Sequence, residues 1–197
     1  MQAILVYAAG MPVAPMNDEE ARTRLLDTAE ALFYAEGIQA VGMDRIRAES
    51  GVALKRLYRL YPAKESLVTA YLERRDQRWT SGLRDAVTGS ADPVGAVFDW
   101  LARWFSEPDF RGCAFLNAYG ELGTGPAGVL DVVRRHKAEL RALLAEVAGP
   151  GPGREGLAEQ LLLLVEGATV VAALEPGPGP ALRAREAAYV LVRGGRE

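Results

Sequence analysis

Apolar side chains recur every three or four residues through almost the whole chain, which is the spacing of one face of a helix. Glycine and proline interrupt this pattern where helices are expected to end, as at Gly37, Gly51 and Pro62. Alternating apolar and polar runs bounded by hairpin turns, the signature of strands, are missing from the sequence. We therefore predict an all-α fold, with helices over residues 21–38, 43–50, 54–61, 63–87, 93–105, 112–123, 127–149, 154–174 and 182–195.

Three helices, of which the second and third are short, come before the long helix at 63–87, and we place a domain boundary where this long helix begins. We expect a small three-helix domain at 18–64 and a larger helical domain at 65–197, with Gly/Pro linkers at 149–153 and 175–181 inside the latter. Residues 1–17 are interpreted as a flexible N-terminal arm. Alternatively they are sequence upstream of the true start, because Met11 and Met16 can also begin a chain.

The net charge of −3 conceals an uneven distribution. Residues 21–64 carry eight basic and five acidic side chains, whereas the rest of the chain carries fifteen and twenty-one. A basic segment in an acidic protein indicates an end that faces nucleic acid.

The residue counts exclude several classes of protein. A single cysteine, Cys113, allows no internal disulfide, and one cysteine with one histidine cannot build the usual zinc cages, so we expect no metal and no cofactor. Uninterrupted apolar runs stay below the roughly 18 residues of a membrane span, and the first residues lack the basic start of a secretory signal. We predict a cytoplasmic protein without a membrane partner. Cys113 is interpreted as buried packing; the alternative is a thiol redox switch, which lacks a second cysteine to resolve it.

The segment 51–67, GVALKRLYRLYPAKESL, carries the strongest chemical signal. Two short helices joined through a glycine fit a helix-turn-helix, in which the second helix enters the major groove of DNA while cations and hydroxyls hold phosphates. The alternative is that these cations form only the solvated side of an amphipathic helix; the glycine turn and the helix lengths favour DNA. The buried positions expected for the motif are Ile46, Ala48, Val52 and Leu57, and the candidate DNA-binding residues are Arg45, Leu54, Lys55, Arg56, Tyr58, Arg59 and Lys64.

Residues 22–72 resemble the DNA-binding domain of the TetR (tetracycline-repressor-like) family of bacterial regulators. The pattern that carries the resemblance is Leu32-Phe33, Gly37, Ile46, Gly51-Val52, Leu57-Tyr58, an aromatic residue at 61, Lys64-Glu65 and Leu67. The stretch RGCAFLNAYGEL at 111–122 also looks like a common form of the central part of the family. The chain departs from the pattern at Gly42 and Ala53, where the family often has Thr and Ser, and at Lys55-Arg56, where it often has Gly-Thr.

The resemblance implies an N-terminal helix-turn-helix domain that binds operator DNA, with Tyr58 and Lys64 on phosphates. It also implies a C-terminal domain that binds a small-molecule effector and forms a homodimer, and a repressor that the effector releases from DNA. The helix at 154–174 also favours a dimer, because it is apolar nearly all round and, with the last helix of each of two chains, would form a four-helix bundle. The alternative is that it is an internal core helix of a monomer.

Aromatic and polar side chains in the larger domain are candidates for an effector pocket, which needs apolar walls and a few polar groups. Aromatic residues at helical spacing are more often core, and a single histidine on an apolar face is more often satisfied by the protein. For Glu121 the alternative is that it caps a neighbouring helix or pairs with an arginine. Two rival functions stay open: a DNA-binding regulator without an effector, and an enzyme that uses Glu121 and His136. The candidate ligand-binding residues are Trp100, Trp104, Phe105, Phe115, Asn117, Glu121, His136 and Leu140.

Overall fold

The structure is a computed structural model that describes residues 16–151 and 153–194. These residues form helices and turns, with no strand among them, as the sequence predicted. The expected N-terminal arm lies outside the described residues, apart from its last two positions. The helices are α1 (Asp18–Glu36), α2 (Met43–Ser50), α3 (Leu54–Leu60), α4 (Lys64–Val87), α5 (Pro93–Phe105), α6 (Ala114–Leu122), α7 (Ala127–Ala148), α8 (Arg154–Leu174) and α9 (Gly179–Gly194).

Local chemistry explains where the first helices begin and end. The Asn17 side chain accepts a hydrogen bond from the Glu20 amide at 2.8 Å, so α1 starts earlier than the apolar pattern alone predicted. Gly51 adopts the left-handed conformation (φ 68°) that turns the chain between α2 and α3. Ala53 precedes α3, and its methyl group offers no acceptor where a serine would cap the helix.

The last helix begins three residues earlier than predicted. It starts at Gly179 rather than Leu182, so part of the expected linker at 175–181 is helical. Pro180 lies in the first turn, where its missing N–H group has no intrahelical partner to lose.

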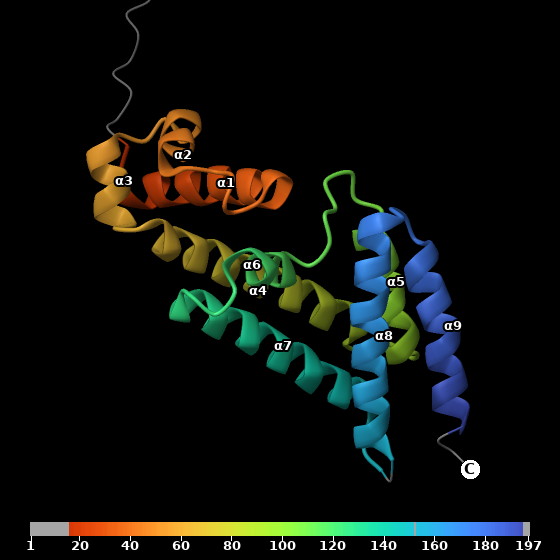
Figure 1. Cartoon of the computed structure of the whole chain (residues 1–197). Helices are drawn as coiled ribbons and strands as arrows, with labels where there is room; N and C mark the ends of the chain where they lie inside the picture. Colours follow the sequence, from red (N-terminus) through yellow and green to blue (C-terminus); the bar gives the residue numbers. More distant parts are fainter. Residues whose placement is uncertain (1–15, 152, 195–197) are drawn as a thin grey trace, which may run out of the picture.

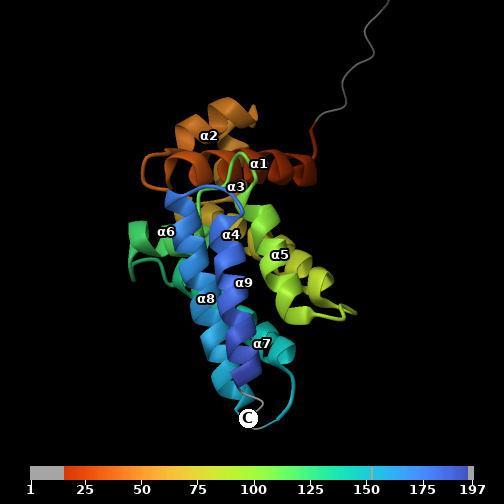
Figure 2. The ribbon, with the colours of Figure 1, turned by 90° about the vertical axis from the view of Figure 1, so that its right-hand side faces the viewer.

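Figure 1 shows how the long helices connect the two ends of the molecule. Helices α1, α2 and α3 lie together at one end, and α4 leads from α3 towards α5 at the other. Helix α7 runs beside α4, and α8 and α9 stand side by side, as the turned view of Figure 2 confirms. A shift of α4 therefore reaches both the N-terminal helices and the C-terminal bundle.

The buried apolar residues form two core clusters. The first joins α1, α2 and α3 to the start of α4, to α6 and to the start of α7, and includes Tyr71 and Val132. The second joins the end of α4 and α7 to α5, α8 and α9, and includes Leu83 and Leu143. Since α4 and α7 contribute to both clusters and the first extends well past residue 64, the boundary at 64/65 stays a prediction.

Helix α8 is the most apolar element. By length and composition alone it could cross a membrane, although 39% of its apolar window is buried against the rest of the protein. It packs against α7 and α9, as a core helix of a folded domain does. Its remaining apolar surface is the feature that needs an explanation.

Candidate nucleic-acid interface and effector cavity

The core of the helix-turn-helix is built as the sequence predicted at three of four positions. Ile46 and Leu57 are fully buried and Val52 is 2% exposed, so α2 and α3 pack on each other and on α1. Ala48 is exposed, and the prediction that it is buried was wrong. Residues two apart on a helix point to opposite sides, so Ala48 and Ile46 cannot both face the core.

The outer face of α3 carries apolar, aromatic and basic groups together. Leu54 and Tyr58 lie one turn apart and are 46% and 45% exposed, and Lys55 beside them is also exposed. A large apolar side chain exposed on the second helix of such a motif is positioned to touch a base edge, and a tyrosine hydroxyl to bind a phosphate.

Two other basic residues of α3 are held by the start of α1. The Arg59 guanidinium donates two hydrogen bonds to the Asp18 carboxylate, at 2.7 and 2.6 Å, and hydrogen bonding with Arg59 is the main cause of the lowered pKa of Asp18. Arg56 donates to the backbone carbonyl of Met16 at 2.6 Å. A DNA phosphate that binds either side chain has to compete with these partners.

The remaining candidates lie on either side of α3. Arg45 on α2 pairs with Glu36 at the end of α1 and with Glu49 one turn on. The Lys64 Nζ atom in the first turn of α4 lies 6.0 Å from the centre of the Phe33 ring. A count of cations could not reveal these acidic partners, because Asp18 lies before the helix predicted at 21–38 and meets Arg59 only in the folded chain.

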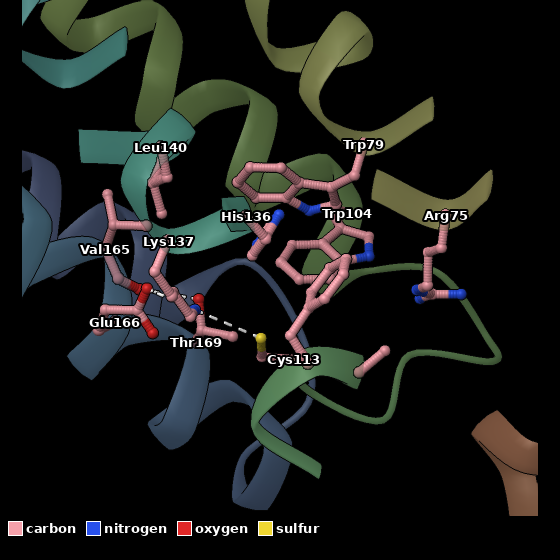
Figure 3. A pocket seen from close by; sticks show the side chains of 12 residues that line it. Arg75, Trp79, Trp104, Cys113, His136, Lys137, Leu140, Val165, Glu166 and Thr169 are labelled. Carbon is pink, nitrogen blue, oxygen red and sulfur yellow. Dashed lines mark hydrogen bonds and ion pairs between the residues drawn. The ribbon is translucent and has the colours of Figure 1, made fainter. Parts of the chain in front are cut away.

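A small cavity lies between α4, α5, α6, α7 and α8. Its volume is about 10 Å³, which is room for about one water molecule. Aromatic, aliphatic and charged side chains line it together, and Figure 3 shows them converging from the surrounding helices. The lining residues are Arg75, Trp79, Trp104, Cys113, Ala114, Phe115, His136, Lys137, Leu140, Val165, Glu166 and Thr169.

The charged groups of this cavity are paired. The buried His136 makes a 2.7 Å hydrogen bond with Asp76 through its Nδ1 atom, and its ring stacks on Phe115 with 3.7 Å between the ring centres. Burial opposes a charge on His136, but the hydrogen bonds with Asp76 and Cys113 outweigh burial and raise the pKa of His136. Lys137 donates to Glu166 at 2.6 Å. The cavity is therefore apolar in its walls and ionic on one side.

The structure brings four of the eight predicted ligand-binding residues to this cavity: Trp104, Phe115, His136 and Leu140. Trp100 packs edge-on against Trp79, one of the lining residues, and Phe105 packs behind Trp104. Asn117 lies outside the lining and donates to the Arg111 carbonyl at 3.0 Å.

Glu121, the eighth candidate, acts at the other end of α6. Its carboxylate accepts hydrogen bonds from the backbone amides of Ile38 and Gln39, at 3.0 and 2.7 Å, in the turn between α1 and α2. At the beginning of α6, the Tyr34 hydroxyl donates to the Gly112 carbonyl at 2.9 Å. Helix α6 is thus fixed to the helix-turn-helix at both ends, while its first turn lines the cavity.

Sequence reasoning missed most of the polar lining. Lys137 and Glu166 form an ion pair between α7 and α8 that no motif predicted. One signal was present: Glu166 is the only charged residue between 161 and 174. An acid in so apolar a helix indicates a buried or half-buried partner.

The helix-turn-helix at one end and the helical bundle around a cavity at the other define a DNA-binding transcriptional regulator. The family model "Bacterial regulatory proteins, tetR family" matches residues 25–71. The crystal structure of SCO4454, a TetR-family transcriptional regulator from Streptomyces coelicolor, is 33% identical with a TM-score of 0.83, and the match covers 91% of this chain and 97% of that one. The chain belongs to the TetR family.

Other relatives agree with this assignment. The HTH-type transcriptional regulator Rv1255c of Mycobacterium tuberculosis is 27% identical, over 82% of this chain and 94% of its own length. The HTH-type transcriptional activator FasR of Mycolicibacterium smegmatis is 33% identical over 90 residues, which are 42% of this chain and 41% of FasR. These relatives are regulators, so the prediction that the chain is not an enzyme is confirmed.

Proposed function

We propose that the chain is an effector-responsive repressor that binds operator DNA as a homodimer and releases it when a small molecule enlarges the cavity. The observation that carries this proposal is the position of α6, which lines the cavity with its first turn and holds the helix-turn-helix with its last. A regulator of bacterial transcription acts in the cytoplasm, where its DNA lies.

The size of the cavity supports a coupled movement. A space of about 10 Å³ admits about one water molecule, so any larger effector has to displace the helices that line it. Those helices include α4, which contacts α1, and α6, whose Glu121 holds the turn between α1 and α2. An effector that binds the displaced state a hundredfold better supplies about 2.7 kcal/mol of coupling, enough to shift DNA occupancy strongly.

The second route to the DNA-binding helices is a charged junction between α4 and α1. Arg74 and Arg75 donate to the Glu30 carboxylate at 2.8 and 3.1 Å, and Arg78 pairs with the same group. Glu30 is 17% exposed, so water screens these pairs only partly. Movement of α4 is therefore transmitted to α1 and, through α1, to α3.

The exposed apolar face of α8 and α9 supports the homodimer. Leu163 and Leu174 are 72% and 82% exposed, and Val170 between them is 53% exposed, on one stripe of α8. On α9, Val190 is 61% exposed. A patch of this kind on a regulator marks a protein interface. Two copies joined there present two recognition helices, which reach successive major grooves if they lie about 34 Å apart.

The direction of regulation rests on the family resemblance, and one relative carries the opposite label, since FasR is named an activator. A reporter gene behind the operator distinguishes repression from activation. Deleting the regulator raises expression if it represses and lowers expression if it activates.

Operator binding is the first experiment. Fluorescence anisotropy with labelled tiles of about 40 base pairs from the DNA around the gene, at physiological salt, should identify one tile that binds tightly, as specific sites exceed non-specific ones by about a thousandfold or more. Uniform weak binding to all tiles at every protein concentration would contradict a local operator.

Two substitutions test the interface on α3. Tyr58→Ala removes an exposed aromatic group and should abolish binding to this tile without loss of helical content. Arg56→Ala should abolish tight binding too, and should reduce the slope of log affinity against log salt by about one unit if the side chain meets a phosphate. Intact binding by both variants would show that α3 does not read the DNA.

A further inference from the structure

The second helix of the helix-turn-helix, α3, presents an apolar side chain to solvent where it begins. Leu54 is the first residue of α3 and is 46% exposed, whereas Leu57 and Leu60 of the same helix are buried. Among the residues that the structure describes, the other large aliphatic side chains exposed to this degree lie on α8 and α9, at the other end of the molecule (Figure 1). A single exposed leucine is common on a protein surface, so its position has to show what it can bind.

Leu54 lies where a helix-turn-helix meets the edges of the bases. In this motif the N-terminal residues of the second helix enter the major groove and touch the bases there. Ala53, directly before Leu54, is exposed as well, so the start of α3 offers two neighbouring apolar groups. Apolar side chains recognise one feature of the major groove, which is the C5 methyl group of thymine.

The amide side chains that read adenine are engaged elsewhere in this part of the chain. Asn and Gln bind the adenine edge through two hydrogen bonds, and residues 17–64 contain one of each, Asn17 and Gln39, with neither on α3. The Asn17 side chain caps α1, and the Gln39 side chain donates to the Glu121 carbonyl. From α3, an A·T pair is therefore distinguished chiefly by its methyl group.

The basic residues of α3 are less free to read guanine than their number indicates. Arg59 donates two hydrogen bonds to Asp18, and Arg56 donates to a backbone carbonyl before α1. Lys55 is exposed beside Leu54 and is available for a guanine edge or a phosphate. Leu54 is therefore the side chain of α3 whose contact selects an A·T pair.

We propose that Leu54 reads one thymine in each half of the operator by packing against its C5 methyl group. This inference rests on the proposed function, because it needs two chains on one operator, and it adds the base that α3 selects. Uracil, which lacks the methyl group, should be a poor substitute for this thymine. 5-Methylcytosine carries the methyl group at the same place in the groove and should satisfy the same contact.

A site selected from random-sequence DNA by the full-length protein supplies the operator for the test, wherever the natural site lies. Each thymine of the selected site is replaced in turn by uracil, symmetrically in both halves. Uracil keeps the base pair and its O4 acceptor and removes only the methyl group. In fluorescence anisotropy, replacing one particular thymine should weaken binding about fourfold for each half, the factor that corresponds to burial of one methyl group.

Three variants link the methyl group to the side chain. Leu54→Ala should bind the thymine site more weakly, and its affinity should differ less than about twofold between the thymine and uracil sites, as expected when one partner of a contact is already removed. Leu54→Met keeps an apolar side chain and should retain the preference for thymine. Lys55→Ala, the neighbouring control, should weaken binding to both sites equally. Circular dichroism verifies that each variant keeps its helical content.

Two further DNA changes separate the methyl contact from the phosphate contacts. Uracil leaves every phosphate in place, so the slope of log affinity against log salt should not change in the parent protein. When the same T·A pair is replaced by C·G, a methyl group on C5 of that cytosine should strengthen binding about fourfold for each half. The Leu54→Ala protein should not respond to this methylation.

Two results would overturn the reading of thymine by Leu54. One is a selected site in which no replacement by uracil weakens binding. The other is a uracil effect of the same size in the Leu54→Ala protein, which would assign the methyl contact to another side chain. In both cases operator binding itself stands. A selection that yields no preferred sequence would instead contradict the proposed function, and this inference with it.

Discussion

The attachment of Glu121 to the α1–α2 turn is the most testable link between the two ends of the molecule. Replacement by alanine removes the carboxylate that accepts from the amides of Ile38 and Gln39, at 3.0 and 2.7 Å. Ile38 is buried and Gln39 exposed, so water replaces the acceptor only at residue 39. A hydrogen bond to a charged group contributes about 1.5–3 kcal/mol. We therefore expect a loss of about 2 kcal/mol in the free energy of unfolding.

Thermal denaturation followed by circular dichroism measures this loss. In a chain of this size, 1 kcal/mol shifts the melting temperature by about 2–4 °C, so Glu121→Ala should melt about 4–8 °C lower. Gln39→Ala is the matched control, since it removes only the side-chain hydrogen bond to the Glu121 carbonyl and keeps both amides. A melting temperature within about 1 °C of the parent for Glu121→Ala would refute the capping role.

Three further predictions concern the buried pair, the dimer and the α1–α4 junction. The pKa of His136 is raised in the folded state, so its contribution to stability is complete below the unfolded pKa of 6.5 and is lost as the pH rises through the folded pKa. The unfolding free energy from urea titrations should therefore fall over that pH range. His136→Gln should remove this part of the pH dependence. Under the proposed homodimer through α8 and α9, the parent chain should sediment as a dimer in analytical ultracentrifugation. Leu163→Glu should make it a monomer and weaken operator binding, whereas Tyr119→Glu, an exposed position on α6, should leave the parent state unchanged. Glu30→Ala should lower the unfolding free energy by about 2 kcal/mol in the same titrations, because three arginines lose their shared acceptor. An unchanged unfolding free energy would show that water screens the ion pairs of Glu30 with these arginines.

The fold was predictable because helix periodicity and helix stops are local properties of the sequence. Gly37, Gly51 and Pro62 ended helices where their backbone preferences require. The errors came from interactions that periodicity does not encode. Asn17 extends α1 through a side-chain cap, and Pro180 is accommodated inside the first turn of α9 rather than in a linker.

The candidate sites were predictable only in part, because their geometry depends on contacts between residues far apart in the chain. The apolar face of α7 correctly placed His136 in the interior, but its partner Asp76 lies sixty residues earlier on α4. Glu121 is four residues from Asn117 on the same helix, yet it points to the α1–α2 turn and not to the cavity lining. Residue type and spacing identify a face of a helix; they do not identify what packs against that face.

For the same reason, the sequence could not show which groups pair with the cations of the basic stretch that is expected to bind DNA. Of its cations, Arg59 is neutralised by Asp18, and Arg56 is held by the carbonyl of Met16. A phosphate that binds either guanidinium group has to replace these contacts, so they lower the net gain from each cation. They also make the start of α1 part of the interface, because a shift of α1 against α3 changes where both guanidinium groups point. Glu30, Tyr34 and the α1–α2 turn tie α1 to α4 and α6, and under the proposed function a movement of these helices would shift the two guanidinium groups together with α3.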